Sequence, residues 1–295
     1  MNKLVVILGP TASGKTELAI KLAQKFYGEV VSADSRQIYR RMDIGTAKPL
    51  DLKGVKHWLI DIKNPNQNYT AAQFKKDAVK KIKEIQKQGK LPILVGGTGL
   101  YIKAVTENLD IPKIKANPRL REELEKETGE EGLDFIFKKL IKLDPEAAYI
   151  VDPKNPRRVI RALEITLLTK KPFSQQRKIG KLLFDVLKIG ISVPKEEVKE
   201  KINLRVDKMV KEGLVEEVKG LINKYGESQQ AFDAIGYREI IDFLAKKTSF
   251  EQASALIKIN TWHYAKRQMT WFNADKKINW IEDYKKAEVL IKKFL

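Results

Sequence analysis

The chain has 295 residues, of which 43% are hydrophobic, enough for one large domain or two smaller ones with a buried core. Its 57 lysines and arginines against 38 acidic residues give a net charge of +19, which suits a polyanionic partner, although lysine enrichment for solubility or heat resistance would give the same excess. The absence of cysteine excludes disulfides, thiolate metal sites and cysteine nucleophiles, and two histidines are too few for a histidine-rich metal site.

The N-terminal segment carries the most informative pattern. Residues 4–8 are an apolar run typical of a buried parallel strand, and apolar residues recur at helical spacing over residues 17–26. The residues between them fit the phosphate-binding pattern G-x-x-x-x-G-K-[ST]. They are Gly9, Pro10, Thr11, Ala12, Ser13, Gly14, Lys15 and Thr16. Amides at a helix N-terminus favour an anion, Lys15 can reach a terminal phosphate, and Thr16 can hold Mg²⁺.

An ordinary glycine-containing turn is the alternative interpretation of residues 9–16, and the strand and helix on either side argue against it. The first strand begins at the N-terminus, so we expect no leader segment. No apolar run approaches the roughly 18 residues needed to span a membrane, so we expect a soluble, cytoplasmic protein.

Alternating strand and helix patterns over the first 110 residues predict an α/β fold with a parallel sheet of the P-loop NTPase type. Further strands are expected over residues 29–34, 58–61 and 91–95, and a helix over residues 70–88. The phosphate loop, Asp34 and the turn at residues 96–99 each follow a strand. In an open parallel sheet they therefore meet at one edge, where ligands bind.

Asp34 and Thr98 are the polar candidates at this edge. Asp34 could bind magnesium or accept a proton from a substrate, while capping a helix is its structural alternative. Thr98 and the amides of the glycine-rich turn could donate to a phosphate oxygen, and close packing of helix on strand is the alternative there.

From residue 117 to residue 169 the pattern becomes helical and highly charged, with breaks at three prolines. It predicts a helical insertion, residues 111–184, within a catalytic core made of residues 1–110 and 185–295. Arg157 and Arg161 share a helical face, and with Arg158 they suit phosphate or base contacts. A solvated basic face is the alternative.

The second part of the core begins with a strand over residues 187–193. Helices are expected over residues 195–211, 214–225, 237–244 and 250–272, followed by a strand over residues 278–281 and a terminal helix. Residues 265–272 mix basic and aromatic side chains, a combination that can bind a nucleic acid strand, but we interpret Trp271 and Phe272 as core anchors. We interpret His57 as a structural histidine.

Several further patterns lie in register along the chain, among them S-A-D-S-R-Q-I-Y at residues 32–39, D-I-G-T-A-K-P at 43–49 and A-I-G-Y at 234–237. Others lie at residues 96–101, 155–164, 202–207 and 265–272. With residues 9–16 they cover essentially the whole chain and closely resemble the tRNA dimethylallyltransferases, also called tRNA isopentenyltransferases.

The resemblance implies transfer of a dimethylallyl group from dimethylallyl diphosphate to N6 of adenosine 37 in tRNAs that read codons beginning with U. It implies Mg²⁺ as the cofactor, held by Thr16, and catalysis by Asp34, Thr98, Lys15 and Arg205, with Asp34 taking the N6 proton. The insertion is expected to grip the anticodon stem-loop, and the enzyme to act as a monomer. The tRNA-binding residues that the resemblance implies are Asp34, Ser35, Arg36, Gln37, Thr98, Arg121, Arg157, Arg158, Val159, Ile160 and Arg161.

Three other functions fit parts of the sequence. A P-loop small-molecule kinase would need a nucleotide-specificity element and an acceptor pocket, and the sequence shows neither clearly. A prenyltransferase for free AMP or ADP has no use for the large basic insertion. An RNA-binding module with a vestigial P-loop is at odds with the intact Lys15, Thr16, Asp34 and Thr98.

Overall fold

A computed structural model describes the chain except for residues 1, 50, 112–113, 115–116 and 177–179. Residues 112–113, 115–116 and 177–179 belong to the predicted insertion and lie outside the described residues. The chain divides into two compact units, Met1–Thr106 with Leu182–Leu295, called here the core unit, and Glu107–Lys181, called the helical unit. Within the described residues, no helix combines the length and apolarity that a membrane crossing requires.

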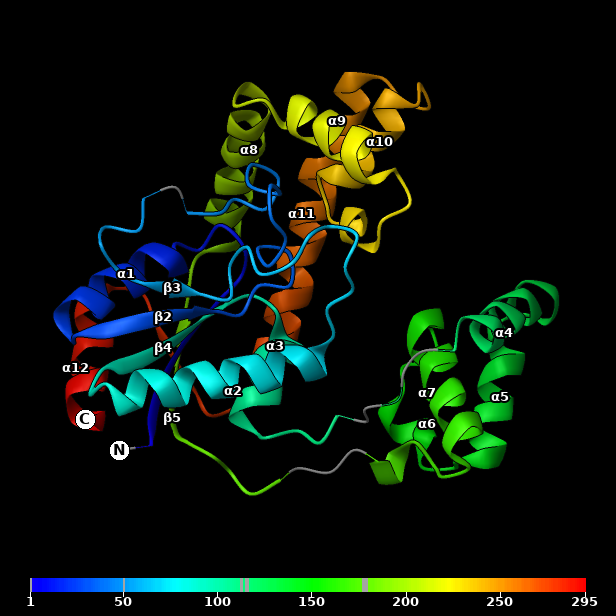
Figure 1. The fold of residues 1–295 in the computed structure, drawn as a ribbon, viewed down its shortest axis with the longest axis horizontal. Helices are drawn as coiled ribbons and strands as arrows, with labels where there is room; N and C mark the ends of the chain where they lie inside the picture. Colours follow the sequence, from blue (N-terminus) through cyan, green and yellow to red (C-terminus); the bar gives the residue numbers. More distant parts are fainter. Residues whose placement is uncertain (1, 50, 112–113, 115–116, 177–179) are drawn as a thin grey trace. The chain divides into compact units, whose positions relative to one another are not determined.

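The core unit is built on a six-stranded sheet in which all paired strands run parallel (Figure 1). The strand order is β3-β2-β4-β1-β5-β6. The strands are β1 (Lys3–Leu8), β2 (Gly28–Ser32), β3 (His57–Trp58), β4 (Leu91–Gly96), β5 (Asp185–Ile191) and β6 (Ile278–Ile281). This arrangement confirms the predicted α/β class and brings the carboxyl ends of the strands to one edge.

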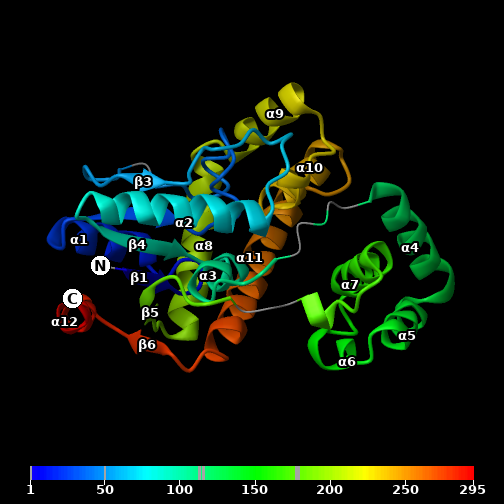
Figure 2. The same ribbon diagram turned by 60° about the horizontal axis from the view of Figure 1, so that its bottom comes forward.

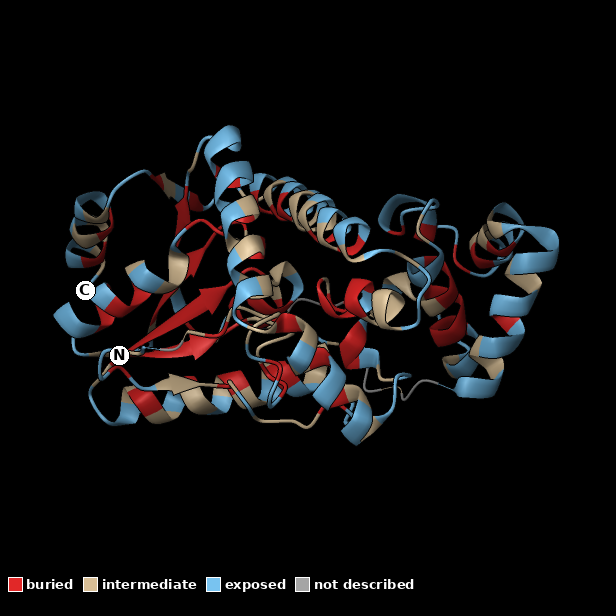
Figure 3. Ribbon diagram, turned by 90° about the horizontal axis from the view of Figure 1, so that it is seen from above, coloured by how far each residue is buried: buried red, intermediate tan, exposed pale blue. Residues whose placement is uncertain are grey.

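Alternation along β1 shows why both faces of the sheet are covered. Leu4 and Val6 pack into a cluster with α2 (Ala71–Lys87) and α3 (Gly99–Thr106). Val5 and Ile7 point the other way, toward α1 (Lys15–Lys25) and α12 (Tyr284–Phe294). All four side chains have no exposed surface, which accounts for the unbroken apolar run in the sequence. Figures 2 and 3 show these helical layers and the buried strands between them.

A third cluster joins the C-terminal helices to the loop that follows β2. The helices are α8 (Lys195–Lys211), α9 (Leu214–Tyr225), α10 (Tyr237–Leu244) and α11 (Phe250–Asn273). Ile202, Val218 and Tyr237 of this layer pack with Ile38 and Met42 of the loop. The loop is therefore anchored on helices that follow it by more than 150 residues in the sequence.

The helical unit has a core of its own. Its helices are α4 (Pro118–Glu131), α5 (Leu133–Leu143), α6 (Ala147–Ile150) and α7 (Pro156–Thr169). Ile136, Leu140 and Leu163 are at most 1% exposed and lie in one cluster. The two ends of the helical unit, near residues 108 and 181, are called here the neck. There the Asn108 side-chain amide donates to the carbonyl of Lys181 at 2.9 Å, and the Gly180 N–H donates to the carbonyl of Asn108 at 3.2 Å.

Most predicted elements of the core unit are confirmed, with two informative differences. The predicted strand over residues 58–61 is only His57–Trp58, because Leu59 and Asp61 adopt φ of +64° and +55°, which no strand accommodates. The strand expected to end at Asp34 ends at Ser32, and Asp34 instead begins a turn.

Candidate active site

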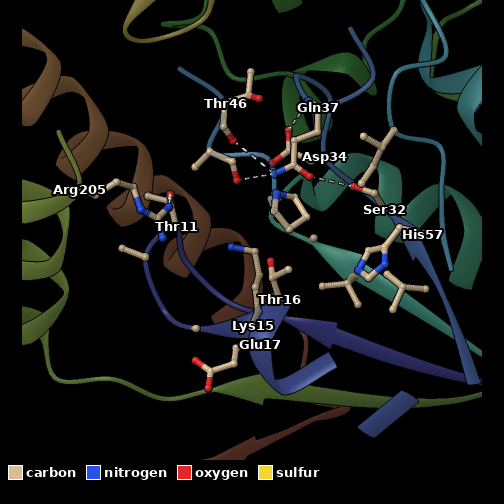
Figure 4. A pocket seen from close by; sticks show the side chains of 18 residues that line it. Thr11, Lys15, Thr16, Glu17, Ser32, Asp34, Gln37, Thr46, His57 and Arg205 are labelled. Atoms are coloured by element: carbon tan, nitrogen blue, oxygen red, sulfur yellow. Dashed lines mark hydrogen bonds between the residues drawn. The ribbon is translucent and has the colours of Figure 1, made fainter. Parts of the chain in front are cut away.

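The phosphate-binding pattern forms the turn between β1 and α1. Gly14 has φ of +82°, which favours glycine, and Lys15 begins the helix. A Cβ on Gly9 would lie 2.9 Å from the Ser13 hydroxyl, so a larger residue there would displace the Ser13 side chain. The turn borders a cavity of about 290 Å³ (Figure 4). Of the predicted site residues, the cavity is lined by Thr11, Ala12, Gly14, Lys15, Thr16, Asp34, Gln37 and Arg205.

Two partly buried cations, Lys15 and Arg205, line the cavity. Burial, together with the nearby charge of Arg205, lowers the pKa of Lys15 to about 8, against the opposing pull of Asp34. Burial also lowers the pKa of Arg205, whose Nη1 donates to the Thr11 hydroxyl at 3.2 Å. In the part of the chain that the structure describes, neither cation forms an ion pair with a carboxylate. Two neighbouring cations without a carboxylate partner can both donate to an incoming anion such as a diphosphate.

Asp34 faces these cations from the end of β2. Its Oδ1 accepts the backbone N–H groups of Arg36 at 2.8 Å and Gln37 at 3.3 Å, which fixes the carboxylate in a turn. Among the described residues, Oδ2 has no hydrogen-bond partner, and Asp34 lines the cavity (Figure 4). The capping role and the functional role are thus compatible, because each uses a different oxygen.

Thr98 supports this turn from the neighbouring strand and does not line the cavity. Its Oγ1 accepts the N–H of Ser35 at 3.1 Å, and its own N–H donates to the carbonyl of Ala33 at 3.2 Å. The phenol of Tyr264, on α11, lies beside Thr98. Burial and the charge of Asp34 raise the pKa of Tyr264 to about 12, so the phenol stays protonated beside the carboxylate.

Gln268 is a second residue of α11 that the sequence did not single out. Its Oε1 accepts the N–H of Thr11 at 2.8 Å, and its Nε2 donates to the carbonyl of Gly97 at 2.9 Å. A Cβ on Gly97 would lie 2.1 Å from that nitrogen, which explains the glycine. The side chain is 5% exposed and joins the two glycine-rich turns. The only signal was a glutamine inside a basic, aromatic segment.

The other residues predicted at the edge are engaged within the protein. The Gln37 amide nitrogen donates to the carbonyls of Thr46 and Ala47 at 3.3 Å each. The Arg36 guanidinium donates to the carbonyls of Gln230 and Ala231 at 3.2 Å each. These side chains shape the edge as folded, and their direct contact with RNA stays a prediction.

The structure also bears on the predictions for His57, Trp271 and Phe272. His57 Nδ1 lies 2.9 Å from the carbonyl of Val55, and burial lowers the pKa of the ring; the residue also lines the cavity. Phe272 is 3% exposed and anchors the core as expected. The prediction for Trp271 is wrong: it is 39% exposed, and its indole lies where a Cβ on Gly99 would stand.

The helical unit divides the predicted tRNA-binding residues into two kinds. Arg157 and Arg158 are exposed at the start of α7. Arg121 and Arg161 donate to Glu164 at 2.7 and 2.6 Å. Glu164 has no exposed surface; burial opposes its ionisation, but these two hydrogen bonds prevail and lower its pKa.

Two members of the predicted tRNA-binding set need correction. Val159 and Ile160 are 0% and 6% exposed and pack in the core of the helical unit. Helical periodicity turns them inward while the adjacent arginines face out, so their side chains have a structural role.

Comparison with known proteins identifies the family. The model of the IPP transferase family matches residues 37–275. A curated tRNA dimethylallyltransferase from Bacillus cereus is 45% identical over 285 residues, which are 95% of this chain and 90% of that protein. One from Bacillus anthracis is 44% identical and covers 95% of this chain and 91% of its own length.

Solved structures agree. The tRNA isopentenylpyrophosphate transferase of Bacillus halodurans is 42% identical with a TM-score of 0.74, covering 100% of this chain and 95% of that one. A eukaryotic dimethylallyltransferase described as acting on tRNA is 30% identical with a TM-score of 0.79, covering 96% of this chain and 74% of that one. The family-model match across most of the chain, the level of identity and the shared fold all lead to one assignment: the chain belongs to the IPP transferase family.

Proposed function

We propose that this chain transfers a dimethylallyl group from dimethylallyl diphosphate to N6 of adenosine 37, in tRNAs that read codons beginning with U. Relatives named tRNA dimethylallyltransferase support the reaction. The observation that carries the proposal is one cavity that brings the partly buried cations Lys15 and Arg205 together with Asp34, whose Oδ2 is unpartnered in the described part of the chain. A diphosphate suits the cations, and an amine that must lose a proton suits the carboxylate.

The leaving group sets the main catalytic demand. An adenine amine is a weak nucleophile, so departure of diphosphate must leave much positive charge on the allylic carbon. Stabilising the negative charge on the diphosphate is then the largest contribution the protein can make. The loop amides, Lys15 and Arg205 are held in place for this before the substrate arrives. Diphosphate is here the leaving group, which distinguishes the reaction from a kinase reaction at the same kind of loop.

Thr16 would hold the magnesium ion. Thr16 lines the cavity next to Lys15 in the sequence, and its hydroxyl is an oxygen donor of the kind that Mg²⁺ prefers. Over the described residues, no group of three or more histidine, cysteine or acidic side chains could hold a metal, so most ligands would be diphosphate oxygens and water. Bound there, Mg²⁺ would add positive charge against the departing diphosphate.

Asp34 would take the proton. As the bond from N6 to the allylic carbon forms and the bond from that carbon to the diphosphate oxygen breaks, Oδ2 accepts the proton that N6 loses. Two amides fix Oδ1, so the carboxylate need not reorient. Thr98 acts through Ser35 to hold the turn rather than by facing the cavity.

The acceptor is proposed to bind through the anticodon stem-loop. The net charge of +19 supports a polyanionic partner, and Arg157 and Arg158 offer exposed cations for phosphate contacts. Arg121 and Arg161 would add positive charge to the same surface, while both donate to Glu164 and Arg161 also donates to the carbonyl of Ile114. We further propose that the chain acts as a monomer in the cytoplasm.

One assay tests the reaction. Purified protein is mixed with Mg²⁺, radiolabelled dimethylallyl diphosphate and, in separate reactions, unmodified tRNA, the same tRNA with guanosine at position 37, AMP, or ATP plus candidate acceptors. Label in the first tRNA alone supports the proposal. Label in AMP alone would show a free-nucleotide prenyltransferase, and absence of transfer combined with ATP turnover would indicate a kinase.

A further inference from the structure

Glu217 of α9 binds a loop that forms part of the cavity wall, although Glu217 itself does not line the cavity. Its Oε2 accepts the backbone N–H groups of Asp43 and Ile44 at 2.9 and 2.8 Å. Its Oε1 accepts the N–H of Gly45 at 3.1 Å and the hydroxyl of Tyr237 at 2.6 Å. One carboxylate thus satisfies three consecutive amides and a phenol.

The fit around this carboxylate is close. Tyr237 has no exposed surface, and a Cβ on Gly45 would lie 2.5 Å from its ring, so only glycine allows the loop to approach. Burial and the charge of Glu217 raise the pKa of Tyr237, which keeps it a donor. Ala47 has φ of +49°, uncommon for a residue with a side chain. The segment of residues 43–47, called here the wall loop, is therefore held both by its own turn hydrogen bonds and by this external anchor on α9 and α10.

The wall loop is linked in turn to the predicted proton acceptor. Its carbonyls at Thr46 and Ala47 receive the side-chain amide of Gln37. The backbone N–H of Gln37 donates to Asp34 Oδ1. A continuous set of hydrogen bonds therefore runs from Glu217 through the wall loop and Gln37 to Asp34, entirely within the core unit.

We propose that Glu217 is a positioning residue for the transfer reaction, holding the wall loop so that Gln37 fixes the turn that carries Asp34. This role rests on the proposed function of the cavity. Glu217 acts through other residues and does not touch the substrates. The phosphate side of the cavity, with Lys15 and Arg205, is held separately by Thr11 and Gln268.

The test uses Glu217→Gln, which keeps the size of the side chain. Glutamine offers one acceptor oxygen and adds a donor where four donors already converge. Glu216→Gln is the matched control, because Glu216 is exposed on the same helix. Hydrogen exchange measured on the full chain without substrates should show faster exchange at residues 43–45 and also at residues 36 and 37, with residues 11–16 unchanged. If exchange were faster only at residues 43–45, or faster across the whole core unit, the inference would be overturned.

Kinetics give the second readout. Because hydrogen bonds to a charged group are involved, we expect Glu217→Gln to lower kcat about tenfold and to leave the KM for dimethylallyl diphosphate within about twofold. Gln37→Ala should have a similar effect, and the double variant should be no slower than either single one, since both act on one path. Multiplying effects would contradict the path. Absence of transfer by the wild type would refute the proposed function, whereas the exchange result would still decide this inference.

Tyr237→Phe covers the case in which Glu217→Gln does not fold. It removes one of the four donors and keeps the ring that stacks on Phe232. We expect a smaller fall in kcat with an unchanged KM for the diphosphate. A raised KM for the diphosphate with normal kcat would contradict the inference.

Discussion

Replacing Gln268 by leucine tests whether one side chain holds the two glycine-rich turns together. Leucine has a similar volume but cannot accept from the Thr11 N–H or donate to the Gly97 carbonyl. The first effect is on stability, because the bond to Gly97 is buried and the bond to Thr11 is partly buried. The second is on anion binding, because Thr11 belongs to the turn that lines the cavity.

The size of the stability effect follows from these environments. An unpaired buried carbonyl costs about 1–3 kcal/mol, and loss of an ordinary hydrogen bond about 0.5–1.5 kcal/mol. The sum is about 1.5–4.5 kcal/mol of unfolding free energy. For a domain of about 200 residues this corresponds to a fall in Tm of roughly 3–18 °C.

Gln268→Glu separates the two effects. Its carboxylate still accepts from Thr11 but cannot donate to Gly97, and it puts a negative charge beside the proposed diphosphate site. We expect weaker binding of inorganic diphosphate in this variant than in Gln268→Leu. Asn273→Leu is the control, since Asn273 is exposed at the end of the same helix.

Thermal melts and titration calorimetry with inorganic diphosphate and Mg²⁺ provide the measurements. The reasoning would be refuted if Gln268→Leu melted within about 1 °C of the wild type, because two lost bonds at this site predict several times that change. Equal diphosphate affinity in the leucine and glutamate variants would refute the electrostatic part.

Four further outcomes are expected. Asp34→Ala should abolish transfer and leave tRNA binding largely intact in a filter-binding assay, so lost binding with normal turnover would contradict its role. Lys15 is charged below its pKa of about 8 and neutral above it, so affinity for diphosphate should weaken as pH rises through about 8, a trend that calorimetry would show to be smaller in Lys15→Arg. Glu164→Gln leaves Arg121 and Arg161 without their carboxylate and should lower the unfolding free energy of the helical unit by about 2–4 kcal/mol in a denaturant titration, whereas an unchanged midpoint would show that the cluster is dispensable. Affinity for tRNA should fall steeply with salt, and a flat response would place the positive charge away from the interface.

Local signals in the sequence were enough to locate the elements of the core unit. The helices over residues 195–211 and 214–225 have the predicted bounds, because apolar spacing marks their faces and glycines at positions 213 and 226 mark their ends. The turn between β1 and α1 was predictable for the same reason, since its spacing is local.

The rest depends on contacts between distant residues. Gln268 meets residues 11 and 97, and Glu217 meets residues 43–45, pairings that no single sequence reveals. The other differences between prediction and structure concern which side chains are buried. Val159 and Ile160 lie inside a predicted binding segment but face the core, whereas Trp271 was assigned to the core and remains partly exposed.

The neck at Asn108 makes the helical unit a cassette. Hydrogen bonds join the segment where the chain leaves the core unit to the segment where it returns. The two ends of the helical unit are therefore already neighbours. A protein joined in this way can gain, lose or exchange the piece by a splice at the neck, with little loop-closure entropy to overcome. The helical unit and the core unit can then vary independently during evolution, and in the laboratory the helical unit can be grafted between relatives.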